Sequence, residues 1–445
     1  MAADLRLMRQ AVRSNPEPAT VIDLAHDGRG VARIDGKTVF VHDALPGEQV
    51  TLVRRSRQRR YDEAVLVDVA EPSPDRVAPG CPHFGNCGGC VLQHLDPARQ
   101  LAHKERQLLE NLARIGHVEP ESVLAPLASP GWGYRRRARL GVKWVAAKDR
   151  VLVGFRERGS SYLADIERCR VLTPPLDELI LPLARTIARL TVRARLPQVE
   201  VAAADNATAL VLRVLDPLTN EDLAVLREFA VDHGVRLYLQ PGGYDTVTPL
   251  EPPADDLYYA LPEFDVRLGF EPADFIQVNG ALNRRMVAQA LDLLAPDPAD
   301  AVLDLFCGLG NFSLPLARRA ESVLGLEGDA GLVARARANA ARNGLANASF
   351  AVANLFEDNQ SVPWANRRYD KVLIDPPRAG ALAMLPLLSR FSASRVVYIS
   401  CHPGSLARDA GLLVQEHGWR LVAAGVMDMF PHTAHVESIA VFEPR

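Results

Sequence analysis

The chain has 445 residues, enough for about two to four domains, and its 48% apolar and 24% charged residues are typical of globular proteins. A net charge of −3 excludes a strongly basic protein, so a nucleic-acid partner must be sought in local patterns. No stretch of about 18 apolar residues predicts a membrane span, and the polar segment 1–18 lacks the apolar core of a secretion signal. We therefore expect a cytoplasmic protein whose 6 cysteines do not form disulfides.

Residues 19–69 predict five short strands, separated by turn dipeptides such as Asp27-Gly28. Five short strands with tight turns are typical of the small barrels that bind oligonucleotides. An arginine-rich run, residues 54–60, lies between the last two predicted strands. This run is either a solvated charged hairpin or, on a barrel of this kind, a set of contacts to RNA phosphates.

Three cysteines lie close together, at Cys81, Cys87 and Cys90, and a fourth, Cys169, lies far downstream. Zinc sites usually present two close pairs of ligands, whereas three close cysteines and a distant one resemble ferredoxin-type iron–sulfur ligation. We prefer an iron–sulfur cluster and keep zinc as the alternative. Four thiolates would saturate a cubane cluster, and the spacing departs from C-x3-C-x2-C. The pattern therefore indicates a structural or RNA-organising centre rather than radical chemistry.

The region from the cysteines to about residue 262 carries no recognisable catalytic motif. Leucines at helical spacing predict a helix at about 97–115, and further helical patterns lie near 176–194 and 220–233. Strands are predicted at 138–144, 151–157, 209–215 and 236–240. A second basic cluster, residues 135–139, follows Tyr134 and is another candidate for holding an RNA backbone.

From about Phe270 the chain changes to a regular alternation of strands and helices, the signature of a doubly wound sheet that binds ligands at the carboxyl ends of its strands. The last two predicted strands have no helix between them, so they should form a hairpin with an antiparallel final strand. The predicted strands are 301–307, 321–328, 349–354, 371–377, 395–401, 421–430 and 435–444, and the predicted helices are about 311–320, 330–343 and 404–416.

The segment DLFCGLGNF, residues 304–312, follows a strand and opens a helix, as cofactor-binding loops do. Glu327, Asn354 and Asp375 end the next three strands, where an acid can accept ribose hydroxyls and an amide can meet a base edge. Upstream, Gln277 can both donate and accept, which suits either a uracil edge or a cofactor carboxylate. Glu327 alone is more often a solvated acid, the Asp-Pro-Pro segment alone is usually a rigid turn, and a capping or loop role is about as likely for Gln277. Together, however, the strand-end residues predict a cofactor site. Dinucleotide binding is the alternative.

Cys401 ends the fifth strand of this sheet, next to the DPPR segment and before a helix. A lone cysteine is more often a small buried hydrophobe, but at a strand tip, with Arg378 and a helix start nearby, we expect a lowered thiol pKa and a nucleophile. Glu437 begins the last strand and is the candidate base, against the alternative of an edge-strand carboxylate. A cysteine paired with a base favours methylation of a pyrimidine carbon 5, which needs a thiolate at carbon 6 and later loss of the carbon 5 proton.

Taken together, the segments DLFCGLGNF, IDPPRAG, YISCHP and HVES, with the cysteine set before them, resemble the RNA uracil-C5 methyltransferases from about Ala19 to the end. The resemblance implies an S-adenosylmethionine-dependent enzyme that flips its target base out. It also implies nucleophile Cys401, base Glu437 and a [4Fe-4S] cluster on Cys81, Cys87, Cys90 and Cys169. The cofactor contacts implied are Gln277, Phe306, Asn311, Glu327, Asn354 and Asp375.

By this resemblance the fold is α/β, with a small OB-like TRAM barrel at residues 15–75, a central α+β domain carrying the cluster at 76–265, and a Rossmann-like class I methyltransferase domain at 266–445. The helix near 97–115 is expected to pack on the catalytic domain. Barrel and cluster together favour the relatives that act on 23S ribosomal RNA, with uracil 1939 as the expected target. A transfer RNA uracil and another ribosomal uracil are the alternatives, and no membrane or obligate protein partner is expected.

Overall fold

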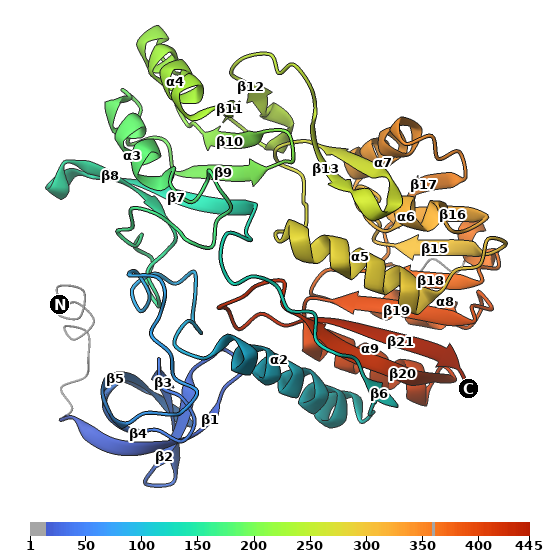
Figure 1. Ribbon diagram of the computed structural model, residues 1–445, viewed down its shortest axis with the longest axis horizontal. Helices are drawn as coiled ribbons and strands as arrows, with labels where there is room; N and C mark the ends of the chain where they lie inside the picture. Colours follow the sequence, from blue (N-terminus) through green and yellow to red (C-terminus); the bar gives the residue numbers. More distant parts are fainter. Residues whose placement is uncertain (1–14, 358–360) are drawn as a thin grey trace.

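The computed structural model describes residues 15–357 and 361–445. Figure 1 shows a small barrel at the lower left, a green sheet above it and a large sheet, yellow to red, on the right. Residues 1–14, which make up most of the polar segment 1–18 on which the expectation about a secretion signal was based, lie outside the described residues. In the two described ranges, no helix is both long enough and apolar enough to cross a membrane.

The predicted five-stranded barrel is confirmed: the described strands between residues 17 and 71 close in the order β1-β2-β3-β5-β4. Alternating side chains such as Val21, Val39 and Leu52 are buried inside it. The arginine run forms the end of β4 and the turn into β5, with which β4 pairs antiparallel, so it does lie on a hairpin. The strands are β1 (Glu17–Leu24), β2 (Gly30–Ile34), β3 (Lys37–His42), β4 (Gln49–Arg57) and β5 (Tyr61–Glu71).

The helix expected after the cysteines is α2 (Pro97–Asn111), followed by a π-helical turn (Leu112–Gly116). The Asp96 carboxylate accepts hydrogen bonds from two backbone N–H groups of the first turn and so caps α2. The helix packs against α9 (Pro403–Gln415) and β20 (Trp419–Met427), as expected, and the short strand β6 (Ser122–Val123) pairs with β20. A segment distant in sequence therefore covers one side of the catalytic sheet.

The central region is built on a sheet whose order, among the described strands, is β12-β11-β10-β9-β7-β8. The four predicted strands are confirmed, but β9, β12 and the β13–β14 hairpin were not anticipated from the sequence. The helix predicted at 176–194 is shorter in the structure, where α3 spans Ile180–Arg189. The helix predicted at 220–233 is confirmed as α4 (Asn220–His233), which Gly234 caps at its C-terminus. The strands are β7 (Arg137–Val145), β8 (Arg150–Gly154), β9 (Gln198–Ala203), β10 (Thr208–Arg213), β11 (Val235–Gln240), β12 (Thr248–Pro249), β13 (Leu257–Leu261) and β14 (Val266–Phe270).

The doubly wound sheet is also confirmed, with the order β17-β16-β15-β18-β19-β21-β20-β6 among the described strands. β21 is antiparallel to both β19 and β20, so the expected terminal hairpin forms. Its central strands are nearly continuous apolar runs, as expected for strands covered on both faces. The new strands are β15 (Ala301–Leu305), β16 (Ser322–Glu327), β17 (Ala348–Val352), β18 (Lys371–Ile374), β19 (Arg395–Ser400) and β21 (Glu437–Pro444).

Two separate hydrophobic clusters cover the two faces of this sheet. One contains α5, α6 and α7, and the other contains α2, α8 and α9. The sequence did not predict α5, although Asn279 caps its first turn. The helices not yet placed are α5 (Gly280–Leu294), α6 (Ser313–Ala317), α7 (Ala330–Arg342) and α8 (Leu385–Leu388).

Candidate functional site

The strand ends of the large sheet converge as the sequence predicts. Glu327 ends β16, next to β15, and its Oε2 accepts a hydrogen bond of 3.1 Å from the Gly308 N–H in the loop after β15. Its Oε1 accepts bonds from the N–H groups of Gly328 at 2.7 Å and Asp329 at 3.1 Å. The carboxylate therefore joins the glycine loop to the start of α7 at the edge where doubly wound sheets bind ligands.

The glycine loop itself is held by a residue that the sequence reasoning did not single out. Asp304 is fully buried, and its Oδ2 accepts a hydrogen bond from the Ser313 hydroxyl on α6. Burial raises the pKa of this carboxyl to about 7. Phe306 and Gly308 both have positive φ angles, of 65° and 54°, a conformation that is strained for phenylalanine. Asp304 is the first residue of the DLFCG motif, and its place in that motif is the sequence feature from which this role could have been predicted.

Three other candidate cofactor residues lie in different surroundings. The Asn311 amide already bonds Asn283 in both directions and accepts from the Tyr259 hydroxyl at 3.0 Å. Asn354 is exposed after β17, and its Nδ2 donates to Glu357 at 2.7 Å. Gln277 is half-buried just before α5. The structure thus places these residues, but it leaves their contacts with a cofactor as a prediction.

The strand register brings the candidate nucleophile and base together. Ser400 at the end of β19 pairs with Ser438 near the start of β21, so Cys401 and Glu437 lie at the same edge of the sheet. Asp375 follows the adjacent strand β18. Cys401 is half-buried and immediately precedes His402, whose Nδ1 accepts from the Ser405 N–H and caps α9. The pair is therefore formed by residues 36 positions apart that meet only because β21 returns beside β19.

The electrostatics of this group differ from the sequence prediction. Burial raises the pKa of Asp375 to about 7, and burial together with Asp375 raises the pKa of Glu437 to about 8. The expected lowering of the Cys401 thiol pKa is wrong. Burial and the facing carboxyls of Glu437 and Asp375 raise it to about 11, although Arg378 acts in the opposite direction. The side of the nucleophile that faces the sheet edge is lined by acids, which a linear sequence does not reveal.

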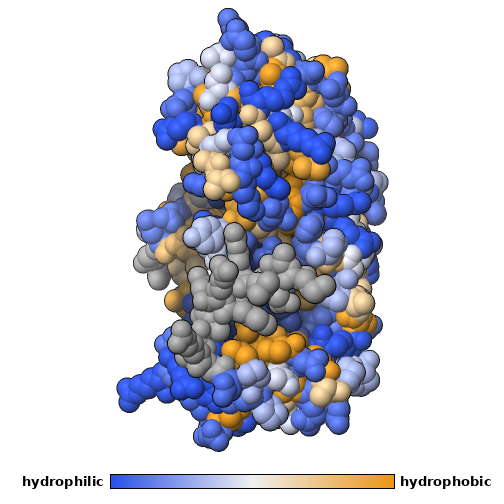
Figure 2. All heavy atoms as spheres, turned by 90° about the vertical axis from the view of Figure 1, so that its left-hand side faces the viewer, coloured by the Kyte–Doolittle hydropathy of each residue, from blue (hydrophilic) through white to orange (hydrophobic). Residues whose placement is uncertain are grey.

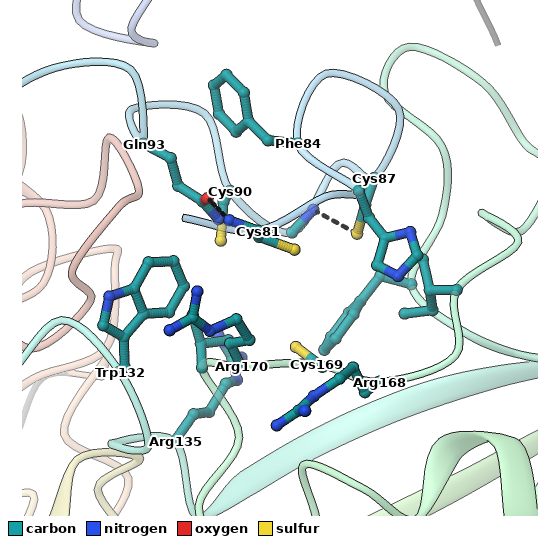
Figure 3. Close-up of a pocket in the computed structure, with 15 residues that line it drawn as sticks. Cys81, Phe84, Cys87, Cys90, Gln93, Trp132, Arg135, Arg168, Cys169 and Arg170 are labelled. Atoms are coloured by element: carbon teal, nitrogen blue, oxygen red, sulfur yellow. Dashed lines mark hydrogen bonds between the residues drawn. The ribbon is translucent and has the colours of Figure 1, made fainter. Parts of the chain in front are cut away.

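The four remaining candidate residues line one cavity away from the sheet. Cys81, Cys87 and Cys90 approach it from one loop, Cys169 approaches from the opposite side, and their sulfurs point toward the same space (Figure 3). The thiols are free, and the Gly89 N–H donates to Cys87 Sγ at 3.5 Å. In the part of the chain that the structure describes, no three His, Cys, Asp or Glu side chains are close enough to hold a single metal ion.

The two basic runs are only partly available to RNA. Arg54 pairs within the barrel with Glu17 and Asp62, both at 2.6 Å. Arg136 Nε donates to the Gln277 carbonyl at 2.9 Å, and Arg137 donates to main-chain carbonyls of 272 and 273. The prediction that all these arginines hold an RNA backbone is therefore wrong for Arg54, Arg136 and Arg137, which stabilise the protein itself.

Known proteins resemble the chain over nearly its whole length. Residues 263–444 match the model of the tRNA (Uracil-5-)-methyltransferase family, and residues 17–52 match the TRAM domain. The chain is 53% identical over 440 residues to the 23S rRNA (uracil(1939)-C(5))-methyltransferase RlmD of Stenotrophomonas maltophilia (strain K279a), covering 98% of this chain and 99% of that protein. It has the same identity and coverage with RlmD of Xanthomonas axonopodis pv. citri (strain 306).

A solved structure agrees with these relatives. The Pyrococcus abyssi tRNA (uracil-54, C5)-methyltransferase, in complex with S-adenosyl-L-homocysteine, superposes with a TM-score of 0.74. The two are 25% identical, and the match covers 96% of this chain and all of that one. The barrel, the central region and the catalytic sheet occur here in one chain, and that chain is 53% identical to such a relative along nearly all of its length. This protein therefore belongs to the RNA uracil-C5 methyltransferase family.

Proposed function

We propose that the protein transfers a methyl group from S-adenosylmethionine to carbon 5 of a uracil in 23S ribosomal RNA, at the position named for its relatives, uracil 1939. The observation that carries the proposal is the meeting of Cys401 and Glu437 at the shared edge of β19 and β21. A thiol beside a buried carboxyl of raised pKa is the pair that covalent catalysis at carbon 5 requires. A ribosomal RNA substrate also implies that the protein acts in the cytoplasm.

In the proposed reaction, the Cys401 thiolate adds to carbon 6, and the electrons of the carbon 5–carbon 6 double bond pass into the ring as an enolate. S-adenosylmethionine, when bound at the strand ends, supplies the methyl group on a cationic sulfonium. Transfer of the methyl group to carbon 5 would break the sulfur–methyl bond and leave neutral S-adenosylhomocysteine; Glu437 then removes the remaining proton at carbon 5. The double bond forms again, the sulfur–carbon 6 bond breaks, and Cys401 leaves as a thiolate.

The residues at the strand ends fit a nucleoside cofactor. Glu327 is at the end of β16, beside the glycine loop, where carboxylates accept ribose hydroxyls. The rings of Phe306 and Phe356 lie 5.6 Å apart next to this edge and offer an aromatic surface. The proposed cofactor contacts remain Gln277, Phe306, Asn311, Glu327, Asn354 and Asp375, of which Asn311 would have to exchange existing hydrogen bonds.

The cysteine cavity fits a [4Fe-4S] cluster held by Cys81, Cys87, Cys90 and Cys169. Four free thiols from two segments face one space, and Gly89 already presents an N–H to a sulfur (Figure 3). Such N–H groups stabilise and tune thiolate-bound clusters. With all four cysteines engaged, the cluster would organise the loop 81–90 against residue 169 and take no part in methyl transfer.

Protein purified without oxygen is expected to contain about four iron and four sulfide ions per chain. Cys169→Ala should lose most of both, because a cluster that lacks one of its four protein ligands is held less tightly and is lost during purification. Cys307→Ala is the matched control, since Cys307 is buried outside the cavity, and it should keep its iron. Metal and sulfide analysis checks this prediction; about one zinc ion per chain and no sulfide would replace the iron–sulfur proposal by a zinc site.

RNA is proposed to bind across the barrel and the central region. Figure 2 shows that the side of the molecule with the barrel at the bottom and the central sheet at the top carries mostly hydrophilic side chains. At the end of β4, Arg57, Arg59 and Arg60 are exposed and remain candidates for phosphate contacts. Domain boundaries at residues 75 and 265 are kept as a proposal, with α2 and β6 belonging structurally to the catalytic sheet.

Methylation mapping tests the proposed function. The purified protein is incubated with methyl-labelled S-adenosylmethionine and 23S ribosomal RNA from cells that lack its gene. Mass spectrometry of RNA fragments should then place a new methyl group on carbon 5 at the position of uracil 1939. Labelling of transfer RNA instead, or of a different ribosomal uracil, would select one of the alternative substrates; a methyl group on an exocyclic nitrogen would reject carbon 5 chemistry.

A further inference from the structure

The candidate base is carried by a loop that a distant helix holds in place. Residues 428–436 connect β20 to β21, and Glu437 is the first residue after them. Most of this loop is buried, including Asp428 and His432. The helix beside it is α2, which packs against β20 and precedes the catalytic domain by more than a hundred residues (Figure 1). Some of the contacts that hold Glu437 in place therefore come from α2, which lies outside the sheet that carries Glu437.

The strongest contact is an ion pair made by Lys104 of α2. Its side chain is only 1% exposed, and its Nζ donates to Asp428 Oδ1 at 2.6 Å and to the Phe430 carbonyl at 3.0 Å. Lysine is almost never fully buried unless it is paired. These two hydrogen bonds hold the first residue of the loop, Asp428, and the third, Phe430, against α2.

A second contact comes from Gln100, one helical turn before Lys104 and on the same face of α2. Gln100 Oε1 accepts the His432 N–H at 2.9 Å, while its Nε2 donates to the carbonyls of Leu92 and Leu95. The His432 carbonyl in turn accepts the N–H groups of Val91 and Leu92, at 2.9 and 3.0 Å. The middle of the loop is thus fastened to α2 and to the segment after Cys90.

The ion pair also acts on Glu437 through charge. The charged or titratable groups that face Glu437 are Asp375 after β18, Cys401 after β19 and Lys104 on α2, the last paired with Asp428 of the loop. His435 lies two residues before it and is exposed. Burial and Asp375 raise the pKa of Glu437, and Lys104 opposes this rise. In a site lined by acids, Lys104 is the cation that favours the carboxylate.

We propose that Lys104 is a positioning residue for proton removal from carbon 5: through Asp428 and the 428–436 loop it fixes the Glu437 carboxyl and keeps it able to accept the proton. This inference rests on the proposed function, since it concerns the release step of that reaction. Lys104 does not touch the substrate in this scheme. Its loss should therefore slow release of the covalent RNA adduct more than formation of the adduct, and should change the pH dependence of release.

The test compares two rates in Lys104→Met: formation of the Cys401–RNA adduct, and release of the methylated adduct after isolation. Release is expected to be at least about tenfold slower near neutral pH, while formation stays within about threefold. Glu437 acts as the base in its deprotonated form. Removal of the cation raises its pKa further, so the release profile should shift upward by about one pH unit and recover in alkaline buffer.

Two further variants keep the test decisive. Lys104→Met leaves Asp428 buried without its partner, which destabilises folded proteins, so the double variant Lys104→Met with Asp428→Asn removes both charges and should fold while still releasing slowly. Arg114→Met is the matched control, because the Arg114 side chain is 77% exposed just after α2 and, among the residues that the structure describes, forms an ion pair only with Glu110. It should match the unmodified protein in both rates.

Two outcomes would contradict the positioning role of Lys104, and a third would contradict the proposed function. If both Lys104 variants release the adduct at the rate and with the pH profile of the unmodified protein, the positioning role is wrong. Equal slowing of formation and release with no shift in the profile would also overturn it, because that is the result of a general loss of structure. Failure of the unmodified protein to form any adduct would instead contradict the proposed function, and the two failures are therefore distinguishable.

Discussion

Cys401→Ala is expected to abolish methyl transfer, by at least about four orders of magnitude, or about 5.4 kcal/mol of transition-state stabilisation. Without the sulfur, carbon 5 of uracil is not activated, and the described thiol in the loop after β15, Cys307, is buried and so does not replace it. The measurement is incorporation of labelled methyl groups into 23S ribosomal RNA. Binding of S-adenosylmethionine and the melting temperature should remain close to those of the unmodified protein.

The covalent nature of this role can be tested separately. RNA that carries 5-fluorouracil has no removable proton at carbon 5, so it should trap the protein in a stable adduct through Cys401. Peptide mapping by mass spectrometry should locate the RNA fragment on that residue. Full activity of Cys401→Ala, or attachment of the trap to another cysteine, would show that the thiol at the end of β19 is not the nucleophile.

Glu437→Gln is expected to have the second largest effect, on a different step. The amide fills the same space but does not accept the carbon 5 proton, so release should slow by about 10²- to 10⁴-fold and a methylated protein–RNA adduct should accumulate on denaturing gels. Glu443→Gln on the same strand is the control, because Glu443 pairs with Arg395 and Arg420 at the far end of β21. Absence of adduct in Glu437→Gln would assign the base elsewhere.

The same site predicts the direction of the pH dependence. Burial and Asp375 hold the pKa of Glu437 at about 8, above its ordinary value, and only the deprotonated carboxyl accepts the proton. Release of an isolated adduct should therefore accelerate as the pH rises toward about 8 and level off above it. The Cys401 thiol, with a pKa of about 11, makes adduct formation rise with pH over a wider range.

Much of the fold could be predicted because its elements are locally consistent. The barrel strands are short and bounded by turn residues, and the strands of the catalytic sheet are apolar runs separated by capped helices. β9, the β13–β14 hairpin and α5 were missed. Their patterns are weak in isolation, and burial rather than local propensity stabilises them: β13, β14 and α5 in the cluster that also contains α6 and α7, and most of β9 in the core of the central sheet.

Basic runs show where sequence reasoning fails for a physical reason. A run of neighbouring arginines suggests a phosphate-binding site. Arg54, however, forms ion pairs with Glu17 on β1 and Asp62 on β5. Arg137 likewise donates to carbonyls of residues 272 and 273, far away in the chain. Only the packing of distant segments decides which cations are left at the surface.

By itself, the sequence determined the family, the order of the domains and the identity of the candidate nucleophile, base and cluster cysteines, because those residue types occur at fixed places relative to strand ends and turns. Only the tertiary structure decided their environment. It placed Asp375 and Glu437 around Cys401, so that the thiol pKa is raised rather than lowered. It also brought Lys104 to the loop before Glu437 across 324 positions, a contact that exists only because α2 packs on the catalytic sheet.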